Sequence, residues 1–267
     1  MGAGWLPGLP HILHKGKSPS WDALRVAFAD VAEDIARSRA DILLLYSTQW
    51  LSVLGTSVQA RPLLEGVHVD ENWHEWGDLP FRFRTHPELA GVLAGALRPA
   101  YPARTVDYEG FPVDTGTILA VQGLGLAREM PVIPVSSWVY ADAAKSTGIG
   151  ALMARAIETA DHRAYVVVSS LLSAGYFTTE IDPAADRFGS VDDEKWCRSV
   201  VTLLEGGNWA GVTELAGANR SVKLDMQFNG FHFLRGALGS RAGRARCRSL
   251  GPVWGTGAAV MHFDLEG

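Results

Sequence analysis

The stretch DILLLYSTQWLS, at residues 41–52, joins an apolar run to a polar tip. Residues 42–46 have the composition of a buried strand, and Gln49 and Trp50 lie in the tip that follows. Functional groups of α/β proteins gather beyond the carboxyl ends of the strands. The stretch therefore predicts one wall of a site, although the amide of Gln49 is a poor metal ligand and moves no protons.

Two further stretches contain side chains of the kinds that bind metals. His11 and His14 lie three residues apart in PHILHKGK, and HVDENWHEW, at residues 68–76, gathers two histidines, three carboxylates and two tryptophans. Two histidines and one carboxylate on one face of Fe(II) leave open positions for oxygen and substrate. A structural or solvated role is the simpler interpretation of the first pair. A partner-binding surface explains Trp73 and Trp76, because aromatic residues are enriched at interfaces.

Other kinds of chemistry lack their sequence signals. DTGT and GTG do not have the spacing of a Rossmann or Walker phosphate loop, and no GxSxG motif occurs. Cys197 and Cys247 stand fifty positions apart without a CxxC motif. This usage of cysteine favours a reducing cytoplasm over a disulfide framework or a thiolate zinc site.

The composition predicts a single domain over residues 1–267, with 47% hydrophobic residues, a net charge of −5 and a pI near 5.9. Nothing in this balance predicts a nucleic-acid partner or an anionic membrane surface. The basic cluster RAGRARCR, at residues 241–248, is interpreted as a solvated loop that enters a strand. No apolar run approaches eighteen residues and no signal-peptide pattern is present, so we expect a soluble cytoplasmic protein without a membrane span.

Hydrophobic periodicity predicts alternating helices and strands. Helices are expected at residues 18–40, 86–100, 114–127, 147–160, 192–207 and 222–238, and strands at residues 42–46, 130–140, 164–175 and 251–266. Residues 55–83, rich in Gly, Pro, Trp and acids, are expected to form a long aromatic and acidic loop that serves function or an interface. The predicted fold is one α/β domain with a central, mostly parallel or mixed sheet flanked by helices.

Several segments, taken in order, resemble the class III (LigB-like) extradiol ring-cleaving dioxygenases. The resemblance runs over nearly the whole chain and is closest to the subunits of the 2-aminophenol-cleaving members. The order in which the matching segments occur along the chain is more specific than any one short motif. The segments are LPHIL (9–13), LLLYSTQW (43–50), GFPVDTGT (110–117), PVIPVSS (131–137) and LLSAGYF (171–177).

The resemblance implies a site in which the family's Fe(II) chemistry has been altered. His11 matches the first histidine ligand, whereas Gln49 stands where the second histidine would be, because STQW replaces SPHW. The late carboxylate falls near Asp225, and Ala174 occupies the position of the acid–base histidine. An amide is a poor substitute for imidazole on Fe(II), and losing the acid–base group removes roughly 10²–10⁴ in rate. The resemblance thus implies a degenerate site with iron absent or weakly bound.

The 2-aminophenol-cleaving enzymes pair a catalytic β subunit with a related α subunit that has lost its iron ligands. YSTQW, GVHVDENWHEWGDLPF, DYEGFPVDTGT and EIDP are similar to that α subunit. The resemblance therefore implies a heterooligomer with a catalytic β-type paralogous subunit, with Trp73 and Trp76 at the interface. The residues implied to line the old pocket are His14, Ser47, Trp50, Asp114, Ser137, Ser173 and Tyr176.

Three hypotheses remain open at this point. The leading one is a non-catalytic or regulatory α-type subunit of an extradiol dioxygenase that acts on 2-aminophenol- or catechol-type aromatics. The second is an active Fe(II) dioxygenase with a rearranged ligand set drawn from His11, His14, His68 or Asp225. The third is a repurposed homologue whose pocket binds a small aromatic molecule without turnover.

Overall fold

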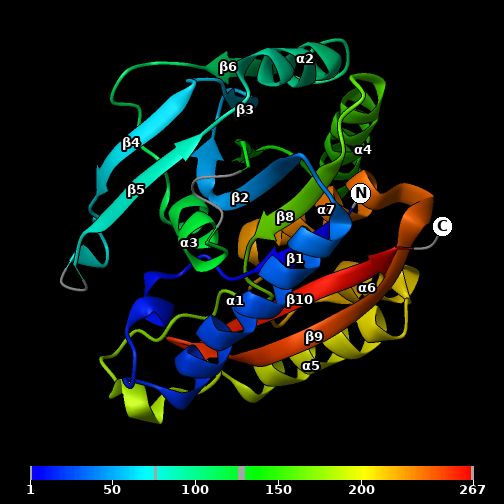
Figure 1. The fold of residues 1–267 in the computed structure, drawn as a ribbon. Coiled ribbons are helices and arrows are strands. Elements are labelled where there is room, and N and C mark those ends of the chain that lie inside the picture. The colour runs from blue at the N-terminus through cyan, green and yellow to red at the C-terminus, as the bar shows by residue number, and fades with distance from the viewer. Residues whose placement is uncertain (1, 75–76, 126–129, 266–267) are drawn as a thin grey trace.

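A mixed β-sheet with helices on both faces forms the body of the protein (Figure 1). The computed structural model describes residues 2–74, 77–125 and 130–265, and within these ranges the sheet has 8 strands in the order β6-β3-β7-β2-β8-β1-β10-β9. These strands are β1 (Gly2–Leu6), β2 (Ile42–Ser52), β3 (Thr56–Gln59), β6 (Ala103–Val106), β7 (Val132–Trp138), β8 (Ala164–Ser169), β9 (Ala242–Val253) and β10 (Thr256–Leu265). The predicted α/β domain with a mixed sheet is confirmed.

The strands at the centre of the sheet run parallel, so their carboxyl ends meet along one edge. β2 is parallel to both β7 and β8, and β1 is parallel to β8. Ser47 of β2 and Leu6 of β1 both pair with Ser169 of β8. The residues that follow β1, β2 and β8 therefore become neighbours, as expected for a site at this edge.

The polar tip STQW lies inside β2 rather than beyond it. The pairing of β2 with β7 shifts between Ser47 and Leu51, so that Thr48, Gln49 and Trp50 form an irregularity in the strand. Such bulges bend a strand and redirect its side chains, and they are common beside functional sites. The shift explains how a strand with an apolar body presents several polar side chains at its end.

Helices on the two faces of the sheet enclose two hydrophobic cores. One core packs strand residues against α2 (Pro87–Leu97), α4 (Ala143–Thr159), α5 (Val191–Glu205), α6 (Trp209–Ala218) and α7 (Asn229–Leu238). The other packs them against η1 (Pro10–Leu13), α1 (Pro19–Ser38) and α3 (Thr115–Gly123). Neighbouring residues of β2 alternate between the cores, which explains why its sequence reads as a continuous apolar run.

Close contact between α4 and α7 requires glycine in both helices. A Cβ atom added to Gly236 would lie 1.9 Å from the carbonyl oxygen of Thr147, and one added to Gly150 would lie 2.1 Å from that of Phe233. Both obstructing atoms belong to the backbone, so neither can move without shifting a helix.

We expect Gly236→Ala to lower the free energy of unfolding by about 2 kcal/mol or more, because the helices must separate to accept the methyl group. Gly91→Ala in α2 is the matched control, since no atom lies within 4 Å of its added Cβ. The control should be neutral or stabilising by about 0.5–1 kcal/mol through helix propensity. Urea unfolding of both variants measures the difference, and equal stabilities would contradict this account.

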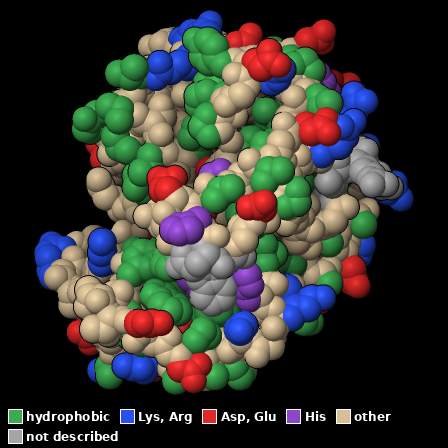
Figure 2. Space-filling model, turned by 90° about the vertical axis from the view of Figure 1, so that its left-hand side faces the viewer, with side chains coloured by type: hydrophobic (Ala, Val, Ile, Leu, Met, Phe, Trp, Pro, Cys, Tyr) green, Lys and Arg blue, Asp and Glu red, His purple; other side chains and the backbone are tan. Residues whose placement is uncertain are grey.

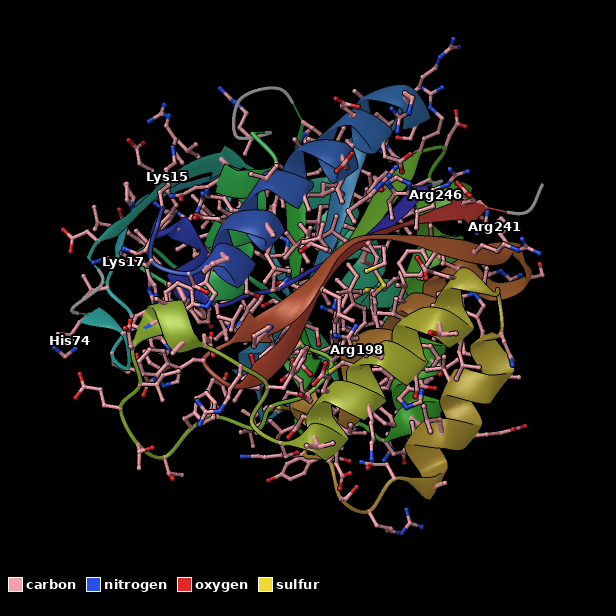
Figure 3. The ribbon with its side chains drawn as sticks, turned by 90° about the horizontal axis from the view of Figure 1, so that it is seen from below. Lys15, Lys17, His74, Arg198, Arg241 and Arg246 are labelled. Atoms are coloured by element: carbon pink, nitrogen blue, oxygen red, sulfur yellow. The ribbon has the colours of Figure 1, made fainter. Side chains whose placement is uncertain are left out.

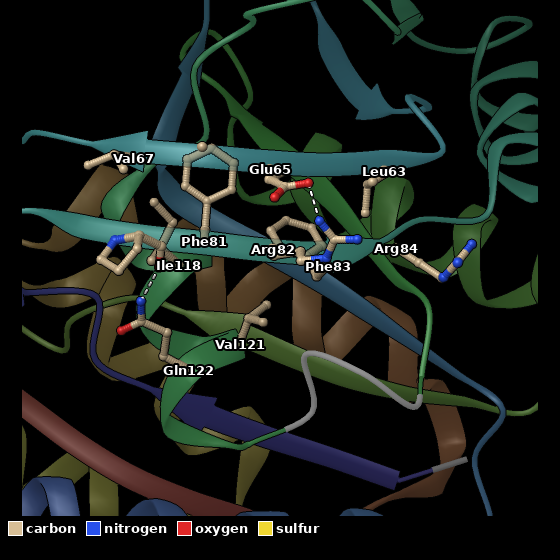
Figure 4. Close-up of a pocket in the computed structure, with 12 residues that line it drawn as sticks. Leu63, Glu65, Val67, Phe81, Arg82, Phe83, Arg84, Ile118, Val121 and Gln122 are labelled. Atoms are coloured by element: carbon tan, nitrogen blue, oxygen red, sulfur yellow. Dashed lines mark hydrogen bonds and ion pairs between the residues drawn. The ribbon is translucent and has the colours of Figure 1, made fainter.

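The prediction of a loop over residues 55–83 is wrong for most of that segment. It contains β3 and a separate hairpin formed by β4 (Leu63–His68) and β5 (Leu79–Arg84), which projects beside α3 (Figure 1). The hairpin was missed because β4 and β5 face solvent on much of both sides and lack a simple apolar alternation. A hollow of about 750 Å³ lies between it and α3, where Phe81 and Phe83 face Ile118 and Val121 (Figure 4).

The predicted helix at residues 222–238 is only partly present. α7 begins at Asn229, and the residues before it form the turn η4 (Asp225–Phe228), in which Met226, Gln227 and Phe228 have positive φ. The strands β1, β6 and β9 and the helix α6 were also not predicted. Parts of two predicted elements, residues 126–127 and 266, lie outside the described residues.

The basic cluster at residues 241–248 lies mostly in β9 rather than in a loop. Arg241 and Arg246 are labelled in Figure 3, and they form ion pairs with Glu158 and Asp264, the second at 2.8 Å. Acidic partners thus accompany two of the cations in this cluster. Among the described residues, no helix is long and apolar enough to cross a membrane.

Candidate functional site

His11 lies in η1, directly after β1, and its side chain is fully buried. Its ring centroid is 4.3 Å from that of Trp73, 5.2 Å from that of Trp21 and 5.5 Å from that of Trp254. Burial among these rings, together with a smaller effect of neighbouring His14, lowers the pKa of His11 from 6.5 to about 3, and Asp70 partly opposes the change. His11 is therefore neutral at physiological pH, and indole rings surround it.

Gln49 lies beside the segment that leads from β1 to His11. A Cβ atom added to Gly8 would lie 3.0 Å from Nε2 of Gln49 and 2.9 Å from Oγ of Ser169. Glycine at position 8 thus makes room for both polar groups. The side chain of Gln49, in β2, thus lies against Gly8, three residues before His11.

Three hydrogen bonds hold the side chain of Asp225, and one of its carboxylate oxygens accepts all three. Its Oδ2 accepts from Oγ1 of Thr48 at 2.6 Å, from Oγ of Ser170 at 2.8 Å and from the backbone N–H of Leu171 at 2.9 Å. Thr48 belongs to the irregular part of β2, and Ser170 and Leu171 directly follow β8. The carboxylate therefore fastens the turn η4 to the ends of two strands.

The segment after β8 directs its side chains to different places. Ala174 is buried, and its N–H donates to the carbonyl of Lys223 at 2.7 Å. Oγ of Ser173 accepts from the N–H of Gly257 in β10 at 3.0 Å. Tyr176 is 41% exposed, and burial of its hydroxyl, with the nearby carboxylates of Asp225 and Asp70, raises its pKa.

The remaining predicted pocket residues mostly support local structure. Asp114 caps α3 by accepting from the N–H of Thr117 at 3.0 Å, and Oγ of Ser47 donates to it at 2.5 Å. Ser137 is buried and accepts from the hydroxyl of Tyr46 at 2.9 Å. Trp50 packs against Phe111, with ring centroids 5.9 Å apart.

His68 and Asp70, from the stretch HVDENWHEW, contact Thr115 at the start of α3, and the sequence identified neither Thr115 nor Asp186 as part of this region. Oγ1 of Thr115 donates to Asp70 at 2.5 Å and lies 3.0 Å from Nε2 of His68. Asp186 accepts from the indole N–H of Trp21 at 2.7 Å and from the N–H of Trp254 at 2.7 Å. In the sequence, Asp70 and Asp186 could be recognised only as aspartates near aromatic residues. The residues that donate hydrogen bonds to them lie tens of positions away along the chain.

Trp73, predicted at an interface, is only half-buried but places its ring against His11 within this chain. Trp76 lies outside the described residues. His14, next to η1, influences the pKa of His11 and so lies near it. The structure thus gathers four of the predicted residues on one side of the edge: His11, His14, Trp73 and Tyr176. Ser137 and Ser173 instead form hydrogen bonds with residues of neighbouring strands.

The residues at this edge do not fit the two-histidine, one-carboxylate set that holds Fe(II). Three indoles crowd the ring of His11, an amide stands at position 49, and an oxygen of Asp225 already accepts three hydrogen bonds. Across the described ranges, His, Cys, Asp and Glu side chains form no group of three or more that could hold a metal ion. No catalytic step through iron is derived from these residues.

The chain belongs to the LigB family, since the model described as the catalytic LigB subunit of aromatic ring-opening dioxygenase matches residues 7–261. It is 36% identical over 265 residues to the 2-aminophenol 1,6-dioxygenase alpha subunit of a Pseudomonas species, covering 97% of each chain. It is 22% identical over 280 residues to the beta subunit, covering 97% of this chain and 92% of that one. An uncharacterized Escherichia coli K12 protein shares the fold, with a TM-score of 0.66, 15% identity and 99% of each chain covered.

Proposed function

We propose that this chain is a non-catalytic, α-type subunit of an extradiol dioxygenase that cleaves 2-aminophenol- or catechol-type aromatics. The observation that carries the proposal is that Oδ2 of Asp225 accepts three hydrogen bonds, which hold η4 to β2 and to the residues after β8. Gln49 and Ala174 at the positions of a ligand and of the acid–base histidine support it. Catalysis and Fe(II) would then reside in a β-type partner.

The relatives support the same division of roles. The chain resembles the protein named as an alpha subunit over its whole length and the one named as a beta subunit at lower identity. An active enzyme with a rearranged ligand set is not favoured. Two candidate ligands of such a set have other partners, because His68 lies at hydrogen-bond distance from Thr115 and Asp225 accepts a hydrogen bond from the N–H of Leu171 after β8.

We expect the chain purified alone to contain less than one equivalent of iron and to leave 2-aminophenol uncleaved. Co-expression with a paralogue that carries the complete histidine set should yield a complex that binds iron and consumes oxygen. Metal analysis and oxygen uptake with 2-aminophenol measure both states. Stoichiometric iron and brisk turnover by the lone chain would refute the proposal.

The β4–β5 hairpin and the loop beside it are the surface that we propose for the partner. Val67 is 60% exposed, Val69 50% and Tyr108 68%, and they line a groove of about 620 Å³. Figure 2 views the side of the molecule that carries the hairpin and shows hydrophobic side chains among the charged ones. Exposed apolar residues that line one groove are typical of an interaction surface. Trp73, which was predicted at an interface, belongs to the loop that joins β4 and β5.

Val67→Asp should weaken binding to the catalytic paralogue at least about tenfold, because a carboxylate would be buried without a partner. Val26→Asp on α1, where the residue is 67% exposed, is the control and should leave binding unchanged. Surface plasmon resonance gives the two affinities, and thermal unfolding checks that both variants remain folded. Equal affinities would place the interface elsewhere.

A further inference from the structure

The hairpin β4–β5 is a two-stranded sheet of its own, so each strand has an outer edge without a neighbouring strand among the described residues. The N–H of Thr85 donates to the carbonyl of Pro62 at 3.1 Å, where the two strands meet the rest of the chain. Hydrogen-bonded and non-hydrogen-bonded pairs alternate along an antiparallel ladder. Because Pro62 and Thr85 form a hydrogen-bonded pair, the N–H and C=O groups of Leu63, Glu65 and Val67 point away from β5.

The two outer edges of the hairpin differ in what they offer to a further strand. On β5, Pro80 lies opposite Val67, so it takes an outward position at which it has no N–H to donate. Its carbonyl accepts a hydrogen bond from the side-chain amide of Gln122 in α3. On β4, no hydrogen bond joins the outward backbone groups of Leu63, Glu65 and Val67 to another described residue. The free edge is therefore that of β4.

A groove of about 620 Å³ lies beside this free edge. Residues 63–68, which make up β4, all line it, and β5 contributes Phe81. The facing residues, 108–113, belong to the segment that joins β6 to α3. Neighbouring strands of a sheet lie about 4.8 Å apart, so a chain that pairs with β4 would lie in this groove. The groove thus has the position of a third strand.

Charge in the groove indicates the kind of strand that fits. Glu65 and Glu109 line it together with Arg61, and two carboxylates against one guanidinium leave a net charge of −1. The side chains of Glu65 and Glu109 remain 54% and 89% exposed beside their arginine partners. Leu63 and Val67 flank Glu65 on the same face of β4, because side chains alternate along a strand. A paired strand would therefore place a basic side chain opposite Glu65 and apolar side chains opposite Leu63 and Val67, and such cross-strand pairs stabilise sheets.

We propose that an extended segment of the catalytic partner subunit adds to the free edge of β4 as a third strand of the hairpin sheet. The segment carries Lys or Arg opposite Glu65 and apolar residues two positions away on each side. Strand addition of this kind obtains affinity from main-chain hydrogen bonds and specificity from alternate side chains. The proposal rests on the proposed function, which supplies the partner, and it specifies how the hairpin surface binds that partner.

Glu65→Pro should weaken binding to the catalytic paralogue at least about tenfold, because an acceptor of the added strand is left without its donor. The hairpin's own hydrogen bonds come from the neighbouring residues, so proline is tolerated here as Pro80 is in β5. Arg82→Pro is the matched control, since Arg82 lies opposite Glu65 and its N–H points out from the other edge. Both variants lose the ion pair between Glu65 and Arg82 (Figure 4). The control should bind within about twofold of the wild type, because exposed ion pairs contribute little.

Glu65→Thr separates the side chain of Glu65 from its backbone. Threonine keeps the outward N–H and favours a strand, but it removes the carboxylate that faces the basic residue of the partner. This variant should weaken binding by about threefold, which is less than the loss for proline. Surface plasmon resonance of the full-length chains gives the affinities, and circular dichroism checks that each variant is folded.

Hydrogen exchange of the wild-type chain provides a readout that needs no variant. Formation of the complex should slow exchange at the amides of Leu63, Glu65 and Val67 at least about tenfold and leave those of Arg82 and Arg84 on the other edge unchanged. Equal affinities for Glu65→Pro and its control, or unchanged exchange along β4 in the complex, would overturn strand addition and leave the proposed function in place. Failure of the wild-type chain to bind the paralogue at all would overturn both.

Discussion

Asp225→Ala is expected to lower the free energy of unfolding by about 3 kcal/mol, because three donors lose a charged acceptor at once. Thr48, Ser170 and Leu171 all donate to the same oxygen of Asp225. Without it, the turn η4, with its run of positive φ angles, loses its attachment to β2 and β8. Urea unfolding measured by circular dichroism gives the difference.

Asp225→Asn is the informative control for this prediction. The amide oxygen of asparagine can still accept two of the three hydrogen bonds, so the variant should retain most of the stability and cost about 1 kcal/mol. An iron ligand would behave differently, because a neutral amide is a poor substitute for a carboxylate on Fe(II). Equal losses for alanine and asparagine would show that the charge, rather than the hydrogen bonds, matters at this position.

Stability should also fall as the pH drops below about 6.5, because the buried His11 resists protonation. Its pKa in the folded protein is about 3, whereas the unfolded chain takes up the proton near 6.5. The unfolded state thus binds more protons between these values, and the contribution of His11 to stability is complete above 6.5 and lost progressively toward 3. Between pH 7 and pH 5 the loss is about 2 kcal/mol.

His11→Phe tests this origin of the pH dependence, since a phenyl ring fits among the indoles without titrating. The difference in unfolding free energy between pH 7 and pH 5 should shrink by about 2 kcal/mol relative to the wild type. Part of the dependence should remain, because burial also lowers the pKa of His232, to about 4, and that of His262. An unchanged difference in the variant would show that His11 is protonated in the folded state.

Long apolar or periodic segments of the sequence predicted their structure correctly. The helix at residues 18–40 corresponds to α1, and the strands at residues 42–46 and 130–140 correspond to parts of β2 and β7. Burial on both faces explains the strands, because such strands need no alternation. The hairpin β4–β5 lacks this signal, since it is separate from the main sheet and largely exposed. The residues of η4 were predicted to be helical, because the spacing of hydrophobic residues does not reveal the positive φ angles of Met226 and Gln227.

The site could be predicted residue by residue only where the resemblance supplied positions. It indicated His11, Gln49, Ala174 and Asp225, but not what the side chains do. That Asp225 binds Thr48 and Ser170 depends on the meeting of β2, β8 and η4, which no local pattern encodes. The contact between the rings of Trp21 and Trp254 could not be predicted for the same reason, because the two residues are 233 positions apart and meet across the fold.

β9 ends the sheet on one side, so one row of its backbone donors and acceptors has no neighbouring strand among the described residues. A strand of this length invites further chains to add to the sheet and aggregate. Arg244, Arg246 and Arg248 project from it at every second position. This spacing would bring like charges together if two copies joined along β9. Asp264 and Asp30 neutralise part of this charge by pairing with Arg246 and Arg248. The repulsion that remains disfavours association by sheet extension at this edge.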